Sequence, residues 1–177
     1  MVSELLSKLW DLRDYERAVA GGAVLFHRGD SVGSLFVVVE GEVQLTRTDE
    51  TGKSLILQRA SAGSILAEAS IFSDVYHCDA IASAPSKAFA VAKPLLRQRL
   101  STDAALAEAW AAYLARQVQQ ARFRCEILAL RTVAERLDMW LSWQDDARAS
   151  RTWLSVAREI GVSPEALYRE LAKRRLR

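Results

Sequence analysis

The amino-acid sequence predicts an α+β protein: a β-roll (a double-stranded β-helix or jelly roll), then one long helix, then a C-terminal helix-turn-helix. Three observations predict this order. Short runs rich in Val, Ile, Leu and Phe, broken by Gly and Asp, fill residues 23–92. Residues 103–143 then contain neither Gly nor Pro. Residues 152–177 finally combine two short amphipathic segments with a turn that contains Gly.

The N-terminal residues 3–16 are expected to form a short helix, because their leucines fall on one side. The apolar runs that follow are expected to be the strands of the β-roll, since each ends at a turn signal such as Gly or Asp. These runs cover residues 23–27, 34–40, 42–48, 53–58, 79–83 and 87–92. Residues 67–73 are expected to form a short helix within the roll.

Pro94 opens a helix of about two turns, and residues 101–103 cap a longer helix. Small and apolar residues on the longer helix recur at alternating steps of four and three, which is a heptad seam. The seam consists of Ala107, Ala111, Leu114, Val118, Ala121, Cys125 and Leu128. It predicts parallel pairing with a second copy through residues 107–128, and packing of this helix on its own β-domain stays open as the alternative. The pattern shifts near 130–132, where we expect a hinge.

Residues 152–177 carry the helix-turn-helix pattern. Gly161 follows a short amphipathic helix, and Ser163 offers an N-cap to a second helix, in which Pro164 is the first residue. On the second helix, the apolar Leu167 and Leu171 are expected to face inward, and the polar residues outward. This second helix is the one expected to enter the major groove of DNA.

The charge distribution favours a polyanionic partner for the same end of the chain. From residue 148 to residue 177 there are eight Lys or Arg and three acidic residues, a net charge of +5. Since the whole chain carries +2, the remainder carries −3. Residues 145–150 are expected to be a polar linker into this region.

Composition excludes several other classes of protein. Half of the 177 residues are apolar, so the chain is not expected to be disordered. No stretch approaches eighteen uninterrupted apolar residues, and the N-terminus lacks the features of a secretory signal, so we expect no membrane span and a cytoplasmic protein. Two Cys do not make a disulfide framework. No hydrolase, nucleotide-binding or zinc-enzyme motif is found, so an enzyme is not expected.

Four segments together resemble the Crp/Fnr family of transcription regulators, over nearly the whole chain. Leu-Phe-His-Arg-Gly-Asp at 25–30 is similar to the entry of that family's β-roll, and Phe-Val-Val-Val-Glu-Gly-Glu-Val at 36–43 to its hairpin. Gly-Ser-Ile-Leu-Ala-Glu-Ala-Ser-Ile-Phe at 63–72 resembles the start of its phosphate-binding cassette. Gly-Val-Ser-Pro-Glu-Ala-Leu-Tyr-Arg at 161–169 resembles its recognition helix.

The resemblance implies a domain order and a set of partners. Residues 1–100 would be a cyclic-nucleotide-binding-like sensor domain, 101–131 a dimerisation helix and 132–177 the DNA-binding domain. The partners implied are a palindromic double-stranded DNA site, a second copy of the chain and RNA polymerase. The residues expected to contact DNA are Ser163, Glu165, Tyr168, Arg169, Lys173 and Arg174, with Arg175 and Arg177 as further phosphate contacts.

Two departures from the family pattern matter. Cyclic-nucleotide binders of this family have a Gly where this chain has Ala67, and an Arg-Ser or Arg-Thr pair where it has Cys78 and Asp79. A thiol and a carboxylate offer no cation to a cyclic phosphate, so cAMP and cGMP are not expected to bind there. The family's module also continues into a β-hairpin wing, and here the sequence ends at Arg177, so a helix-turn-helix lacking the wing is expected.

The signal is therefore expected to be something other than a cyclic nucleotide. In the family-like alignment, five candidate sensor residues fall on the cassette and on the long helix: Glu68, His77, Cys78, Arg122 and Cys125. Three interpretations stay open: Cys78 and Cys125 as ligands of a soft metal such as copper or zinc, the same two thiols as a redox switch, and His77 or Cys78 as a haem ligand. Burial of the cysteines as small apolar side chains is the plain alternative. Arg122 offers a cation to an organic anion, or a partner to Glu68. The rival function is a β-roll ligand or metal sensor module whose degenerate helix-turn-helix does not bind DNA alone.

Overall fold

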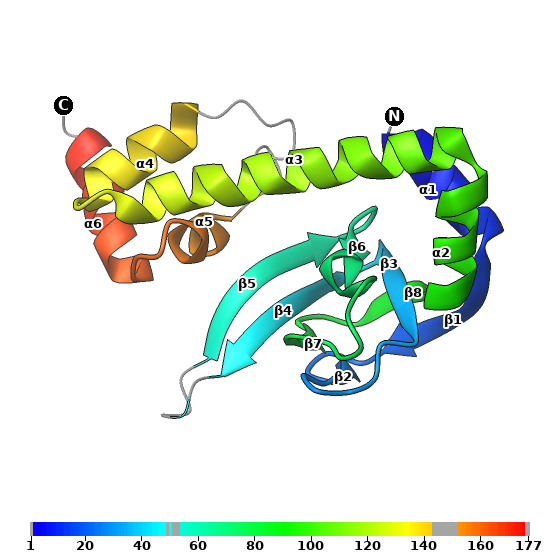
Figure 1. Cartoon of the computed structure of the whole chain (residues 1–177). Coiled ribbons are helices and arrows are strands. Elements are labelled where there is room, and N and C mark those ends of the chain that lie inside the picture. The colour runs from blue at the N-terminus through cyan, green and yellow to red at the C-terminus, as the bar shows by residue number, and fades with distance from the viewer. Residues whose placement is uncertain (1, 49, 51–53, 143–151, 176–177) are drawn as a thin grey trace. The chain divides into compact units, whose positions relative to one another are not determined.

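The computed structural model describes residues 2–48, 50, 54–142 and 152–175 (Figure 1). The chain divides into two compact units, Met1–Ala111 and Ala112–Arg177. The predicted linker 145–150 and the predicted phosphate contact Arg177 lie outside the described residues, as does residue 53 of the predicted strand 53–58.

The first unit contains the predicted β-roll, which is confirmed. Its eight strands form two four-stranded antiparallel sheets, with the orders β1-β8-β3-β6 and β2-β7-β4-β5. The strands are β1 (Arg13–Val19), β2 (Val24–Phe26), β3 (Ser34–Glu40), β4 (Glu42–Thr48), β5 (Ser54–Ser61), β6 (Ile65–Leu66), β7 (Asp79–Ala82) and β8 (Ser86–Ala92).

Two local expectations are wrong. The N-terminal helix α1 is Val2–Asp11, and the chain then continues as strand β1, which pairs with β8, rather than as helix to residue 16. Six of the seven residues of β1 are exposed, so this edge strand has no buried face that would show in the sequence. The expected helix 67–73 is a single 3-10 turn, Glu68–Ser70.

The core of the roll is apolar and aromatic. Phe26 stacks on Tyr76 with ring centroids 3.9 Å apart and on Phe36 at 5.8 Å. The Tyr76 hydroxyl donates to the Ser34 carbonyl at 2.6 Å, so its polar end is satisfied. Cys78 belongs to the same buried cluster.

Helix α2 (Lys93–Thr102) has Pro94 in its first turn, as predicted. Asp103 then caps helix α3 (Ala104–Ala129) by accepting the Leu106 N–H at 2.9 Å, and its carboxylate also accepts from Lys8 at 3.1 Å. The long helix predicted from the sequence is confirmed. Its first turns belong to the first unit and the remainder to the second.

The second unit packs the later part of α3 with α4 (Val133–Ser142), α5 (Trp153–Glu159) and α6 (Pro164–Arg175). Fully buried side chains of the last three helices and their connection, Leu137, Ile160 and Leu167, lie at the centre. Each contributes about 1.5–3 kcal/mol relative to an exposed position. The rest of this core consists of Ile127, Trp140, Val156 and Ala157, flanked by Phe123, Val133, Met139, Val162 and Leu171.

Among the described residues, no helix combines the length and the apolar character that crossing a membrane requires.

Candidate functional site

The start of α6 has the local geometry that the sequence predicts. Gly161 has a φ of 67°, a left-handed conformation that favours glycine, and it lets the chain reverse after α5. Ser163 then caps α6: its Oγ accepts the Ala166 N–H at 3.2 Å, and its carbonyl accepts the Leu167 N–H at 3.1 Å. We call α5, this turn and α6 (residues 153–175) the α5–α6 pair.

One face of α6 is exposed and polar. Glu165, Tyr168, Arg169 and Lys173 are all exposed, and Tyr168 shows 52% of its surface to solvent, whereas Leu167 is fully buried. Hydrogen bonds to the Glu165 carboxylate from its own backbone N–H and from Ser163 lower the pKa of Glu165. The carboxylate is therefore ionised at neutral pH and remains a hydrogen-bond acceptor.

Arg174, predicted to contact DNA, is engaged within the unit instead. Its guanidinium donates to Asp138 at 2.6 Å, to Glu170 at 2.9 Å and to the Ala134 carbonyl at 3.1 Å. The hydrogen bonds that it donates to Asp138 and Glu170 raise the pKa of Arg174. Two carboxylates thus balance its charge, and the residue ties α6 to α4. The side chains of the predicted contact Arg175 and of Arg158 lie outside what the structure describes.

In the first unit, the cassette (residues 63–79) has an apolar and acidic interior. Cys78 is buried, and burial together with the charge of Glu68 raises the pKa of its thiol to about 11. Burial likewise raises the pKa of Glu68, whose Oε2 has no hydrogen-bond partner among the described residues. Ala67, at the family's Gly position, keeps a left-handed φ of 66°. A chain with Ala there therefore retains the turn for which the family uses glycine.

The other polar groups of the cassette contact the cassette itself and neighbouring segments of the first unit. His77 is exposed, and its Nδ1 lies 3.1 Å from the Oγ of the buried Ser70. Partial burial and the nearby Arg47, which donates to the His77 carbonyl, lower the pKa of His77. Asp79, at the family's hydroxyl position, accepts the backbone N–H of Arg28 at 2.9 Å. Its carboxylate also lies 3.4 Å from the His27 ring.

The remaining sensor candidates, Arg122 and Cys125, belong to the second unit, where both are exposed. Their predicted convergence with Glu68, His77 and Cys78 stays a prediction. Within the described residues, no three His, Cys, Asp or Glu side chains gather as a metal site would require. Cys78 would have to lose a proton from a thiol with a pKa of about 11 before binding a metal. The surroundings of Cys78 within the first unit therefore do not favour a bound metal.

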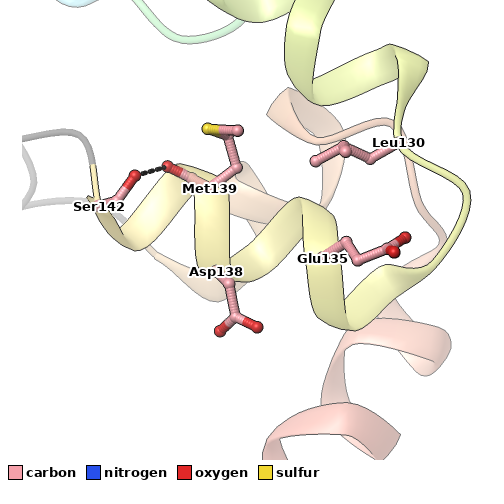
Figure 2. A pocket seen from close by; sticks show the side chains of 5 residues that line it. All are labelled: Leu130, Glu135, Asp138, Met139 and Ser142. Carbon is pink, nitrogen blue, oxygen red and sulfur yellow. Dashed lines mark hydrogen bonds between the residues drawn. The ribbon is translucent and has the colours of Figure 1, made fainter.

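A hollow of about 410 Å³ opens on the surface of α4 in the second unit, and Figure 2 shows its lining. Leu130 and Met139 supply apolar surface, and the Ser142 hydroxyl at its edge donates to the Met139 carbonyl at 2.8 Å. Its two carboxylates have other partners: Glu135 accepts from Thr132, and Asp138 accepts from Arg174. None of the predicted site residues lines it.

Sequence reasoning missed Arg136, which donates to four backbone carbonyls. Two of these carbonyls lie at the end of α3 and two in the turn between α5 and α6. Arg136 stands on the expected helix without any motif around it, and its role depends on where two other helices end. No signal in the sequence could have found it.

The comparisons with known proteins agree with this geometry in the first unit. Residues 16–103 match the family model described as the cyclic nucleotide-binding domain. No curated protein matches the chain significantly.

Several solved structures share the fold. FixK2 from Bradyrhizobium japonicum is similar with a TM-score of 0.75 at 17% identity, over 90% of this chain and 83% of that one. The c-di-GMP-responsive global regulator CLP from Xanthomonas campestris is similar with a TM-score of 0.72 at 19% identity, over 98% and 92%. At these identities the likeness shows the fold alone.

The N-terminal domain of a transcriptional regulator from Streptomyces coelicolor A3(2) is similar at 28% identity, with a TM-score of 0.54, over 67% of this chain and 83% of that one. By their names, CLP is a global regulator and the Streptomyces coelicolor domain is part of a transcriptional regulator.

Proposed function

We propose that this chain is a dimeric, sequence-specific DNA-binding transcription regulator of the Crp/Fnr type, and that its β-roll senses a signal other than a cyclic nucleotide. The observation that carries the proposal is the exposed polar face of the capped helix α6, held on a core by the buried Leu167. A capped helix with an apolar inner face and polar residues in its first turns is what a recognition helix requires. The regulators that share the fold support the same function.

Base reading is assigned to two residues of α6. Glu165, kept ionised by its hydrogen bonds, accepts from a cytosine amino group, and Arg169 donates to the O6 and N7 acceptors of a guanine. Tyr168 contacts the backbone or a thymine methyl group, and Lys173 binds a phosphate. Ser163 serves α6 as its cap and is left with at most one backbone contact. We assign Arg174 to the α4–α6 contact rather than to DNA.

The seam on α3 supports pairing with a second copy. Its positions Val118, Ala121 and Cys125 are exposed in the single chain, and Val118 shows 47% of its surface. An exposed apolar row at heptad spacing is the pattern that parallel helix pairs bury. Pairing along this row would present two copies of α6 to successive turns of DNA, roughly 34 Å apart, and would match a palindromic site.

The cassette supports a signal without a cyclic phosphate. Cyclic-phosphate recognition needs a cation and a hydroxyl donor, and here the two positions hold the neutral thiol of Cys78 and the carboxylate of Asp79. The raised pKa of the Cys78 thiol also disfavours its use as a soft-metal ligand or as a fast redox thiol. An organic, uncharged or cationic ligand near the buried Glu68 fits this chemistry better than a phosphate.

The test is selection of bound sequences from random double-stranded DNA, followed by a gel-shift assay on the enriched site. We expect enrichment of a palindrome and binding of that site at least tenfold tighter than binding of a shuffled duplex at the same salt concentration. Equal affinity for the two duplexes would leave only non-specific binding. No binding of either duplex would instead favour the rival function, a sensor module that does not bind DNA alone.

A further inference from the structure

The connection between α3 and α4, where the sequence predicts a hinge, is covered by a single guanidinium. Arg136 lies in the first turns of α4, and its three nitrogens donate in two directions. The acceptors are Leu130 O at 2.9 Å and Leu128 O at 3.1 Å on one side, and Ile160 O and Gly161 O, each at 3.0 Å, on the other.

These four carbonyls lie at or just beyond two helix C-termini. Helix α3 ends at Ala129 and α5 at Glu159, and the last carbonyls of a helix have no partner within it. A cation at that end also interacts favourably with the helix dipole. One side chain therefore serves as the C-terminal cap of two helices at once and joins their ends.

Direct packing accompanies the hydrogen bonds. A Cβ built on Gly161 would lie 2.6 Å from Cδ2 of Leu128, so the turn of the α5–α6 pair lies directly against the last turn of α3. Deeper in the unit, Ile127 of α3 shares one apolar cluster with Ile160 and Leu167, and Phe123 packs against that cluster. The end of α3 and the α5–α6 pair therefore have a common core.

The connection itself is also hydrogen-bonded. Glu135 and Thr132 form a reciprocal cap at the start of α4, in which Glu135 accepts the Thr132 N–H at 2.9 Å and the Thr132 Oγ1 accepts the Glu135 N–H at 3.1 Å. The Leu130 N–H donates to the Ile127 carbonyl at 3.2 Å. The Leu130 and Thr132 N–H groups at the predicted hinge therefore both have partners within the second unit.

We propose that Arg136 is a positioning residue that fixes the α5–α6 pair on the C-terminal turns of α3, so that residues 123–142 and 152–175 move as one body. The bending that couples signal to DNA would then lie before Phe123 and not at 130–132. The role of α6 in this inference rests on the proposed function, whereas the rigidity of the connection does not. A rotation of α3 from Phe123 onward would then rotate α6 by the same angle.

Hydrogen exchange of the full-length protein without DNA tests the rigidity. The amides of Leu130, Thr132 and Val162 report on it, since each donates within the connection or the turn. We expect slow exchange in the unmodified chain and at least tenfold faster exchange in Arg136→Ala, with the amides of β3 and β8 unchanged. Arg131→Ala is the matched control, because it removes the same charge from an exposed position in the same segment, and it should leave the three amides slow.

If Arg136→Ala unfolds the whole second unit, Arg136→Lys tests the rigidity of the connection instead. One ammonium group cannot reach four carbonyls at two helix ends, so the lysine variant should also exchange faster while the melting of the first unit stays constant. Exchange at the rate of an unstructured peptide in the unmodified chain would overturn the proposal. Unchanged exchange in Arg136→Lys would overturn it too, whether Arg136→Ala shows unchanged exchange or unfolds the second unit.

DNA binding separates this inference from the proposed function. Arg136→Lys should lower affinity for the selected site by roughly tenfold and leave affinity for a shuffled duplex unchanged, because the guanidinium orients α6 and contacts no phosphate. Faster exchange with unchanged specific affinity would overturn the positioning role. Absence of DNA binding in the unmodified chain would defeat the proposed function and leave the exchange result to decide the rigidity.

Discussion

The cassette of the β-roll and the first turns of α6 both resemble recognition elements, yet they use their polar residues in opposite ways. In the cassette, Cys78 is buried as a neutral thiol, and the Asp79 carboxylate accepts the Arg28 N–H of a neighbouring loop. On α6, Glu165 and Arg169 stay exposed on a well-capped helix. A shared fold therefore preserves the backbone scaffold for recognition. The charges at a few positions decide whether the chemistry of recognition remains.

We expect the strongest effect from a substitution on the proposed seam, which tests whether two copies of α6 bind DNA together. Val118→Glu places two like charges on the proposed seam, and an unpaired charge in a buried interface costs about 3–5 kcal/mol. We expect a monomer in analytical ultracentrifugation at concentrations where the unmodified chain is a dimer, and loss of binding to the palindrome. Gln119→Glu is the control, since it adds the same charge next to the seam. A Val118→Glu dimer would break the paired interpretation.

Titration calorimetry with cAMP and cGMP tests whether the cassette binds a cyclic nucleotide. Each hydrogen bond to a charged group contributes about 1.5–3 kcal/mol, so loss of the guanidinium and the hydroxyl should weaken binding by at least about a hundredfold. We expect no heat at micromolar ligand, with a cAMP-binding regulator as the positive control. Micromolar affinity would show that the cassette kept its recognition chemistry by other residues.

Arg169→Ala tests the proposed base contact on α6. Removing a base contact should cost about 1–3 kcal/mol on the selected site and relax the preference at one base pair of each half-site. Lys173→Ala is the contrasting variant: a phosphate contact should weaken all duplexes alike and lower the salt dependence. Gel shifts on single-base variants of the site measure both. Equal losses on all sequences for Arg169→Ala would assign that residue to the backbone.

The smallest effect concerns the buried thiol. Its pKa is about 11 in the fold against an ordinary value of 9.0, so the unfolded chain loses this proton first. The free energy of unfolding should therefore be unaffected below pH 9 and fall by about 1–2 kcal/mol as pH rises from 9 to 11. Urea unfolding of Cys78→Ala should lack this part of the slope, and Cys125→Ala should retain it. An equal slope in both variants would place the Cys78 thiol in water.

Local patterns predicted α6 well, because its cap, its glycine turn and its apolar spacing lie within a dozen residues. Strand β1 could not be predicted, since an exposed edge strand is defined by its partner β8 rather than by its own residues. Cys78 could be placed by resemblance, yet its altered acidity depends on burial beside Glu68. The hydrogen bond from Arg174 to Asp138 joins α6 to α4 across 36 residues of sequence, so a local pattern does not show it.

The common core of α3 and the α5–α6 pair sets where this protein can be divided for a chimaera. A graft that begins at residue 131 or 132 would carry Arg136 away from the carbonyls of Leu128 and Leu130 and split the cluster around Ile127. A segment that can be transferred intact therefore begins ahead of Phe123 and includes the last two turns of α3. A junction between α3 and α4 would instead transfer α4, α5 and α6 without the turns of α3 on which they pack.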